Sequence, residues 1–221
     1  MSAVIHPEPP AEVLAVIEDG IRRLCDSRDP MYRTLLDGIK SGNLLTQAVY
    51  TVDLNPLLDM RQTLNAQAES MYRGWRFIAG SGKAVAAGYV AKTKTPDGWK
   101  LTSVSYGSQL DDSVNAPDPN QFVADLPTAT CELRVLEIPV LNLQVLWYVP
   151  VPDTQGEEEW IVPLSDLNGT QIAQYERMTC TDFRETCRTH LDEFIYIEDP
   201  DPMPNGPLED GEVRRIRDYG G

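Results

Sequence analysis

The stretch YRGWRFIAGSGKAVAAGYVAKTKTPDGWKLTSVSY, residues 72–106, decides the fold. Its apolar, β-branched and aromatic residues predict three strands, over residues 72–79, 84–94 and 99–106. Gly80-Ser81-Gly82 and Thr95-Pro96-Asp97-Gly98 separate these strands, and their residues suit tight reversals of the backbone. We therefore predict an antiparallel meander here.

Helices are predicted before the meander. Apolar residues recur at helical spacing over residues 11–25, and again from Pro30 to about Lys40, where Asp29-Pro30 suits a helix start. Residues 48–54 alternate and favour a strand, and Asn55-Pro56 opens a third predicted helix that runs to about Ser70. The first two helices are too short to be stable alone, so they must pack on another layer.

A second set of strands is predicted after the meander. Residues 107–127 are polar and acidic and suit a loop with a short helix around 108–115. The alternating segments that follow predict strands over residues 131–135, 141–149 and 160–164. A final helix is expected over Asp182–Phe194, with Thr181 or Asp182 as its cap.

This order of elements indicates an α+β fold, with N-terminal helices, a mostly antiparallel, twisted sheet and a C-terminal helix. We expect one domain over residues 1–198, and a loosely ordered acidic tail rich in Pro, Asp and Gly over 199–221. Two alternatives stay open: two small sheets in separate subdomains, or a half-barrel around the third helix.

The composition bears on the partners and on the location of the chain. With 221 residues and a net charge of −15, the chain is an unsuitable partner for nucleic acid or for anionic membranes. It contains no apolar stretch of membrane-spanning length and no secretory signal, and its four cysteines are widely spaced. We expect a soluble protein with reduced thiols in the cytoplasm.

The acidity is concentrated in one part of the chain. Residues 107–176 carry 12 acidic residues and a single basic residue, Arg134. This concentration predicts a non-enzymatic protein that needs no cofactor and binds a basic protein surface or a second copy of itself. The candidate binding residues are Asp111, Asp112, Asp118, Glu157, Glu158 and Glu159.

The alternative is a small hydrolase. His190 is the candidate base, with Cys180 or Cys131 as nucleophile and Asp192 or Glu193 as the orienting carboxylate. Cys180, Cys187 and His190, with Cys131 as a fourth ligand, could also hold a metal, although their spacing matches no strong zinc pattern. The competing interpretation places Cys187 in the buried stripe of its helix, so we expect no metal.

Two further patterns concern small ligands. Gly80-Ser81-Gly82-Lys83 looks like part of a phosphate loop, but Ala84 stands where Ser or Thr is needed and a strand follows. We interpret it as a hairpin turn. A curved sheet with aromatic side chains can also enclose an apolar ligand, and the aromatic residues on predicted strands are Trp75, Trp99, Trp147, Tyr148 and Trp160.

Overall fold

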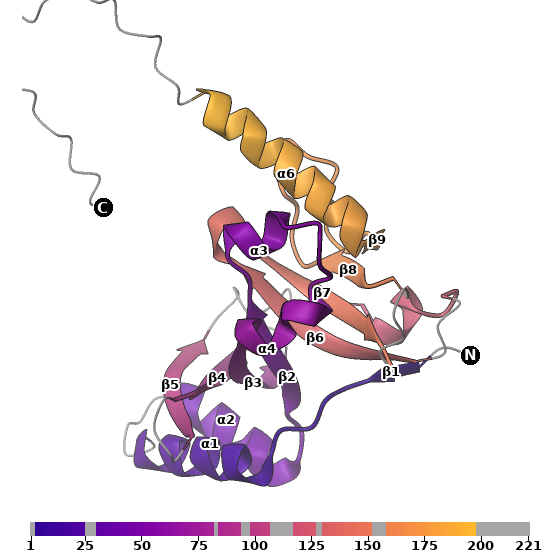
Figure 1. The fold of residues 1–221 in the computed structure, drawn as a ribbon. Coiled ribbons are helices and arrows are strands. Elements are labelled where there is room, and N and C mark those ends of the chain that lie inside the picture. Colours follow the sequence, from indigo (N-terminus) through magenta and orange to yellow (C-terminus); the bar gives the residue numbers. More distant parts are fainter. Residues whose placement is uncertain are drawn as a thin grey trace, which may run out of the picture.

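The structure is a computed structural model that describes residues 3–24, 30–81, 84–93, 98–106, 117–126, 130–151 and 158–197. In these residues, helices pack against one open, mostly antiparallel sheet of nine strands, which confirms the α+β class (Figure 1). The sheet is continuous, so the alternative of two separate small sheets is wrong. The predicted short helix around 108–115 and the tail over 199–221 lie outside the described residues.

The meander predicted from residues 72–106 is confirmed, because β3, β4 and β5 pair in antiparallel succession. The strand order is β5-β4-β3-β2-β6-β7-β8-β9, with β1 beside β6. The strands are β1 (Ala3–Ile5), β2 (Leu45–Thr51), β3 (Tyr72–Ser81), β4 (Ala84–Lys92), β5 (Trp99–Tyr106), β6 (Thr130–Ile138), β7 (Leu143–Pro150), β8 (Trp160–Pro163) and β9 (Met178–Thr179).

Parallel pairing joins the two halves of the sheet. One side of β6 pairs in parallel with β1 over Thr130–Glu132 and with β2 over Val135–Glu137. The other side of β6 pairs antiparallel with β7. Strand β1 had no signal in the sequence, because three residues are too few to show a period. Strand β2 ends at Thr51, three residues before the predicted end.

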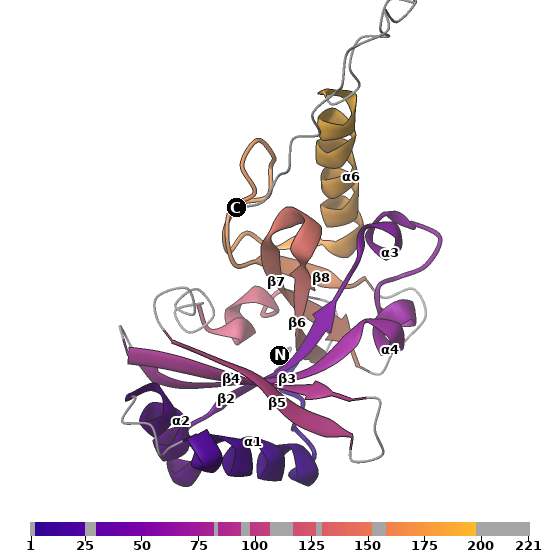
Figure 2. The ribbon, with the colours of Figure 1, turned by 90° about the vertical axis from the view of Figure 1, so that its left-hand side faces the viewer.

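Helices α1 (Ala11–Leu24) and α2 (Pro30–Ser41) cover the meander half of the sheet, as Figures 1 and 2 show. The stripe Val13, Ile17 and Ile21 of α1 is fully buried. A Cβ atom on Gly88 of β4 would lie only 2.6 Å from Cδ1 of Ile17, so glycine lets this helix lie close to the sheet.

The prediction of a continuous third helix to about Ser70 is wrong. The segment forms α3 (Leu54–Leu58), a 3₁₀ turn at Asn65–Gln67 and α4 (Ala68–Met71). The buried guanidinium of Arg184 donates hydrogen bonds to the carbonyls of Leu57 (2.7 Å) and Gln62 (2.8 Å), and to two further carbonyls of the same segment. These carbonyls accept hydrogen bonds from a side chain that is distant in sequence, so they do not form the hydrogen-bond ladder of a continuous helix.

The C-terminal helix α6 (Cys180–Ile197) begins two residues before the predicted start. Its cap is Thr179, whose Oγ1 accepts a hydrogen bond of 2.9 Å from the backbone nitrogen of Asp182. In Figures 1 and 2, α6 extends away from the sheet beside α3. Among the described helices, none combines the length and the apolar character that crossing a membrane requires.

Candidate ligand-binding site

A surface hollow of about 290 Å³ lies where the segment before α1 meets α4 over strands β2, β3 and β4. We call it the aromatic hollow, because three of its lining residues are aromatic and the rest are mostly small or at the rim. Its lining residues are Pro7, Ala48, Tyr50, Ala68, Glu69, Tyr72, Trp75 and Lys92.

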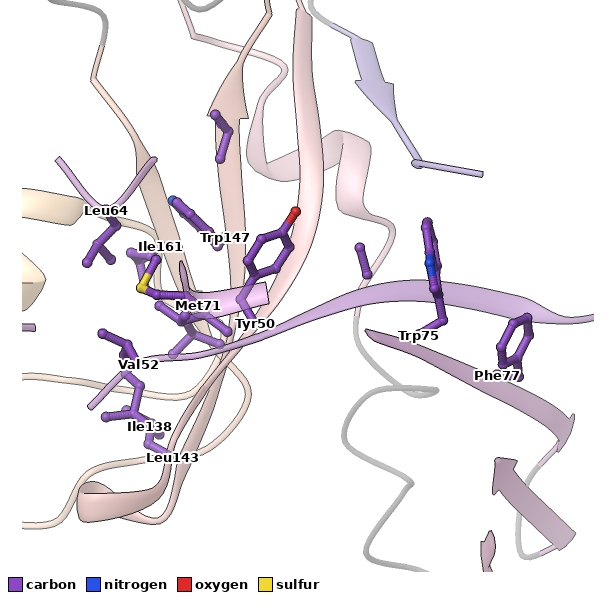
Figure 3. Close-up of a cluster of buried hydrophobic side chains, with 14 of the residues drawn as sticks. Tyr50, Val52, Leu64, Met71, Trp75, Phe77, Ile138, Leu143, Trp147 and Ile161 are labelled. Atoms are coloured by element: carbon purple, nitrogen blue, oxygen red, sulfur yellow. The ribbon is translucent and has the colours of Figure 1, made fainter. Parts of the chain in front are cut away.

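Strand register explains how the walls of the aromatic hollow arise. Ala48 and Tyr50 are two positions apart on β2, so their side chains share one face of the sheet. Ala48 pairs directly with Trp75 on β3. Figure 3 shows Tyr50 and Trp75 rising from the same side of the sheet. Ala48, which also lines the hollow, carries only a methyl group and so takes up little space there.

A β-bulge brings the third ring into the hollow. The register of β2 and β3 shifts so that Val49 pairs with Gly74 while Tyr50 pairs with Tyr72, which leaves Arg73 as the extra residue. Simple alternation would place Tyr72 and Trp75 on opposite faces, because three positions separate them. The bulge turns Tyr72 onto the face of Trp75, and both rings line the hollow.

The bulge depends on glycine at position 74. Gly74 has φ 152°, and a Cβ atom there would lie 2.1 Å from the carbonyl oxygen of Val90. No other residue fits both this backbone conformation and this close approach. An isolated glycine inside a strand pattern is a known sign of a bulge, so the sequence did contain a signal for this feature.

The ring of Tyr50 is held by a cation–π contact with Arg134. The Arg134 guanidinium lies 5.0 Å from the ring centres of both Tyr50 and Trp147. Arg134 is held in turn by Glu132 at 2.6 Å and by the side-chain oxygen of Asn65 at 2.7 Å. The rings of Tyr50 and Tyr72 also contact each other, with centres 5.3 Å apart. These contacts hold the rings of Tyr50 and Tyr72 in place before a ligand binds.

Two buried side-chain hydrogen-bond donors close in sequence to the lining of the aromatic hollow lack a partner among the described residues. Among the described residues, the buried side-chain nitrogens that lack a partner are Nε1 of Trp75 and Nε2 of Gln67. Trp75 lines the hollow, and Gln67 directly precedes the lining residues Ala68 and Glu69. A buried donor without a partner costs about 1–3 kcal/mol. Both donors would gain from an acceptor that the described protein atoms do not supply.

The charge states at the hollow follow from burial. Burial raises the pKa of Tyr50 and of Tyr72, so both phenols are neutral at physiological pH. Glu69 and Lys92 are exposed, and they place one charge of each sign at the rim. The hollow thus combines neutral aromatic walls with a polar rim.

The residues proposed from the sequence for catalysis lie elsewhere. Cys180 lines a hollow of about 470 Å³ with Glu158 and Glu159, whereas His190 lines a separate hollow of about 710 Å³ with Asp182 and Glu185. Ten positions on α6 separate Cys180 from His190, which corresponds to about 15 Å along the helix axis. The structure does not bring this thiol and this imidazole together, and Asp192 lies exposed further along the helix.

The thiols of Cys180 and Cys187 hold their protons. Burial raises the pKa of the Cys180 thiol, and nearby Glu159, which shares a hydrogen bond with this thiol, raises it further. Burial raises the pKa of Cys187 to about 12. Cys131 is also buried. Within the described part of the chain, no group of three or more His, Cys, Asp or Glu side chains is arranged to hold a metal ion.

Four described carboxylates of the acidic stretch 107–176 serve separate local roles. Asp118 caps a 3₁₀ turn by accepting a hydrogen bond from the Asn120 nitrogen at 3.0 Å, and buried Glu159 accepts one from the Trp147 indole. Asp125 and Glu132 form ion pairs with Arg177 and Arg134. Asp111, Asp112 and Glu157 lie outside the described residues. These contacts give no support to a single acidic binding surface, which stays a prediction.

Sequence reasoning missed most of the aromatic hollow. Trp75 is among the strand aromatics that the sequence pattern picks out, but Tyr50, Tyr72, Ala48 and Glu69 are not. Their convergence depends on the bulge and on the broken third helix. Comparison of the chain with known protein families, with curated proteins and with solved structures finds no match.

Proposed function

We propose that this protein binds a small, largely apolar organic molecule in the aromatic hollow. The observation that carries the proposal is the ring lining of the hollow, where Tyr50, Tyr72 and Trp75 converge and Tyr50 is held by Tyr72 and Arg134. Ligand sites in proteins combine aromatic walls with a few polar groups that fix orientation.

The size of the aromatic hollow limits the ligand. A volume of about 290 Å³ corresponds to about ten water molecules at about 30 Å³ each. This volume suits one substituted ring or a short branched chain. The contact of Tyr50 with Tyr72 and Arg134 favours binding without large rearrangement, because these rings are already held in place.

Filling the hollow tests the proposal. Ala68 is half-buried and lines the hollow, so Ala68→Leu should occupy the ligand space without disturbing the sheet. Ala66 is exposed and does not line it, so Ala66→Leu makes the same chemical change outside the site. A set of single-ring and branched-chain compounds would be screened by thermal unfolding and by indole ¹H–¹⁵N NMR.

We expect compounds that raise the melting temperature of the native protein and of Ala66→Leu but not of Ala68→Leu. The bound state should shift the Trp75 indole resonance, assigned with Trp75→Phe, more than those of Trp99, Trp147 and Trp160. If binding to Ala68→Leu is as tight as to the native protein, the hollow is not the site. If no compound binds the native protein, the proposed function is wrong.

A further inference from the structure

The aromatic hollow has the side-chain chemistry of a cation site as well as that of an apolar one. The faces of tyrosine and tryptophan rings carry negative charge density and attract cations. The Arg134 guanidinium already lies over Tyr50 and Trp147 at 5.0 Å. The ring surface that the hollow offers to a ligand cation is therefore chiefly that of Tyr72 and Trp75.

The charges at the rim narrow the class of cation. Glu69 supplies a carboxylate, and the net charge of −15 favours the approach of positive ligands. A primary ammonium would lose strong hydration on entering a hollow walled by rings, whereas a methylated ammonium is weakly hydrated and has an apolar outer surface. The hollow therefore suits a methylated ammonium better than a primary amine.

The charges at the rim also bear on the part of the ligand that lies beyond its ammonium. Lys92 lines the hollow and adds a positive charge at the rim, opposite in sign to Glu69. It would interact with an oxygen atom carried a few bonds away from the ligand's ammonium. We infer that the ligand of the aromatic hollow is a methylated ammonium compound that also carries an acceptor oxygen, an inference that rests on the proposed function.

Two probes of equal shape separate charge from shape. Choline and 3,3-dimethyl-1-butanol both carry a hydroxyl and a group with three methyls, but only choline is positively charged. Titration calorimetry with the native protein should give an affinity for choline at least about tenfold higher than for the alcohol. The difference should shrink at high salt without vanishing, because the contact with the rings is shielded from solvent.

Single-residue variants test whether the preference for choline arises in the aromatic hollow. Glu69→Gln should weaken choline about three- to tenfold and leave the alcohol unchanged. The control is Glu176→Gln, which removes the same charge at an exposed position that does not line the hollow. Tyr72→Leu and Ala68→Leu keep the net charge and should abolish the binding of both probes. Circular dichroism would verify that each variant is folded.

The outcomes distinguish this inference from the function on which it rests. Equal affinity for choline and the alcohol, lost in Ala68→Leu, would overturn the cation inference and leave an apolar site. The cation inference also fails if neither probe binds while neutral ring compounds do. Choline binding that survives in Ala68→Leu would show attraction to the acidic surface only, and it would likewise overturn the inference. If no probe of any class binds, both proposals fail.

Discussion

The indole nitrogen of Trp147 donates a hydrogen bond of 2.8 Å to the buried carboxylate of Glu159. The indole nitrogen of Trp75 is equally buried and has no partner among the described residues. Two tryptophans on the same sheet therefore differ in one hydrogen bond, and this difference can be measured.

Replacing each tryptophan by phenylalanine should give different losses of stability. Trp147→Phe removes the indole donor to the buried Glu159 carboxylate, which keeps the backbone nitrogen of Asn65 at 3.0 Å, so its free energy of unfolding should fall further than that of Trp75→Phe by about 2 kcal/mol. Both variants lose similar ring volume, which serves as the internal control. Urea unfolding followed by circular dichroism measures both. Equal losses would mean that Trp75 also has a partner in solution.

Glycine at position 74 should be essential to the fold and to the hollow. Gly74→Ala combines an unfavourable backbone conformation with a collision against Val90, so we expect a loss of more than about 3 kcal/mol. Gly42 also has positive φ, at 71°, but a Cβ atom there meets nothing within 4 Å. Gly42→Ala should cost only about 1–2 kcal/mol. Similar losses in the two variants would contradict the bulge as described.

The hydrogen bonds from α6 to α3 should depend mainly on Arg184. This guanidinium is 4% exposed and serves four backbone carbonyls, so Arg184→Met should cost about 3–4 kcal/mol. Arg188 is exposed and donates to the carbonyl of Leu58 at 2.7 Å, and Arg188→Met should cost less than about 1 kcal/mol. The prediction is wrong if chemical denaturation ranks the two variants equally.

The stability of the fold should depend on pH through Glu137. Burial raises the pKa of this carboxyl above its ordinary value of 4.5, and the positive charge of Arg76 opposes the shift without cancelling it. A carboxyl with a higher pKa in the folded state favours folding while protonated. The contribution of Glu137 to the free energy of unfolding is therefore full below about pH 4.5. It is lost as the pH rises through the raised pKa of the folded state.

Glu137→Gln tests this dependence, because the amide keeps an oxygen that can accept from Gln144, as the carboxylate does at 3.1 Å. The variant should gain free energy of unfolding relative to the native protein between about pH 4 and pH 7. Urea unfolding at both values measures the gain. Glu176→Gln at an exposed position controls for the loss of one negative charge. If Glu137→Gln and the native protein differ in free energy of unfolding by the same amount at both pH values, the role of Glu137 is refuted.

The parts of the fold with local signals were predictable, and those that depend on distant contacts were not. The meander has three alternating strands with turn residues between them, and α1 has a complete apolar stripe. The third helix was misjudged because Arg184, more than 120 positions away, takes up its carbonyls. The aromatic hollow was missed for a related reason: alternation over residues 72–79 separates Tyr72 from Trp75, and only the bulge at Gly74 reunites them.

The pairing of β1 with β6 has a consequence for synthesis in the cell. Ala3 pairs with Thr130, so 127 positions separate the first strand from its partner. At the usual ribosomal rate of about 5–20 residues per second, β1 waits about 6–25 s for β6 to be made. During this interval β1 has no strand to pair with, and β2 lacks one of its two neighbouring strands. The centre of the sheet is therefore closed only after β6, which ends at Ile138, has been made.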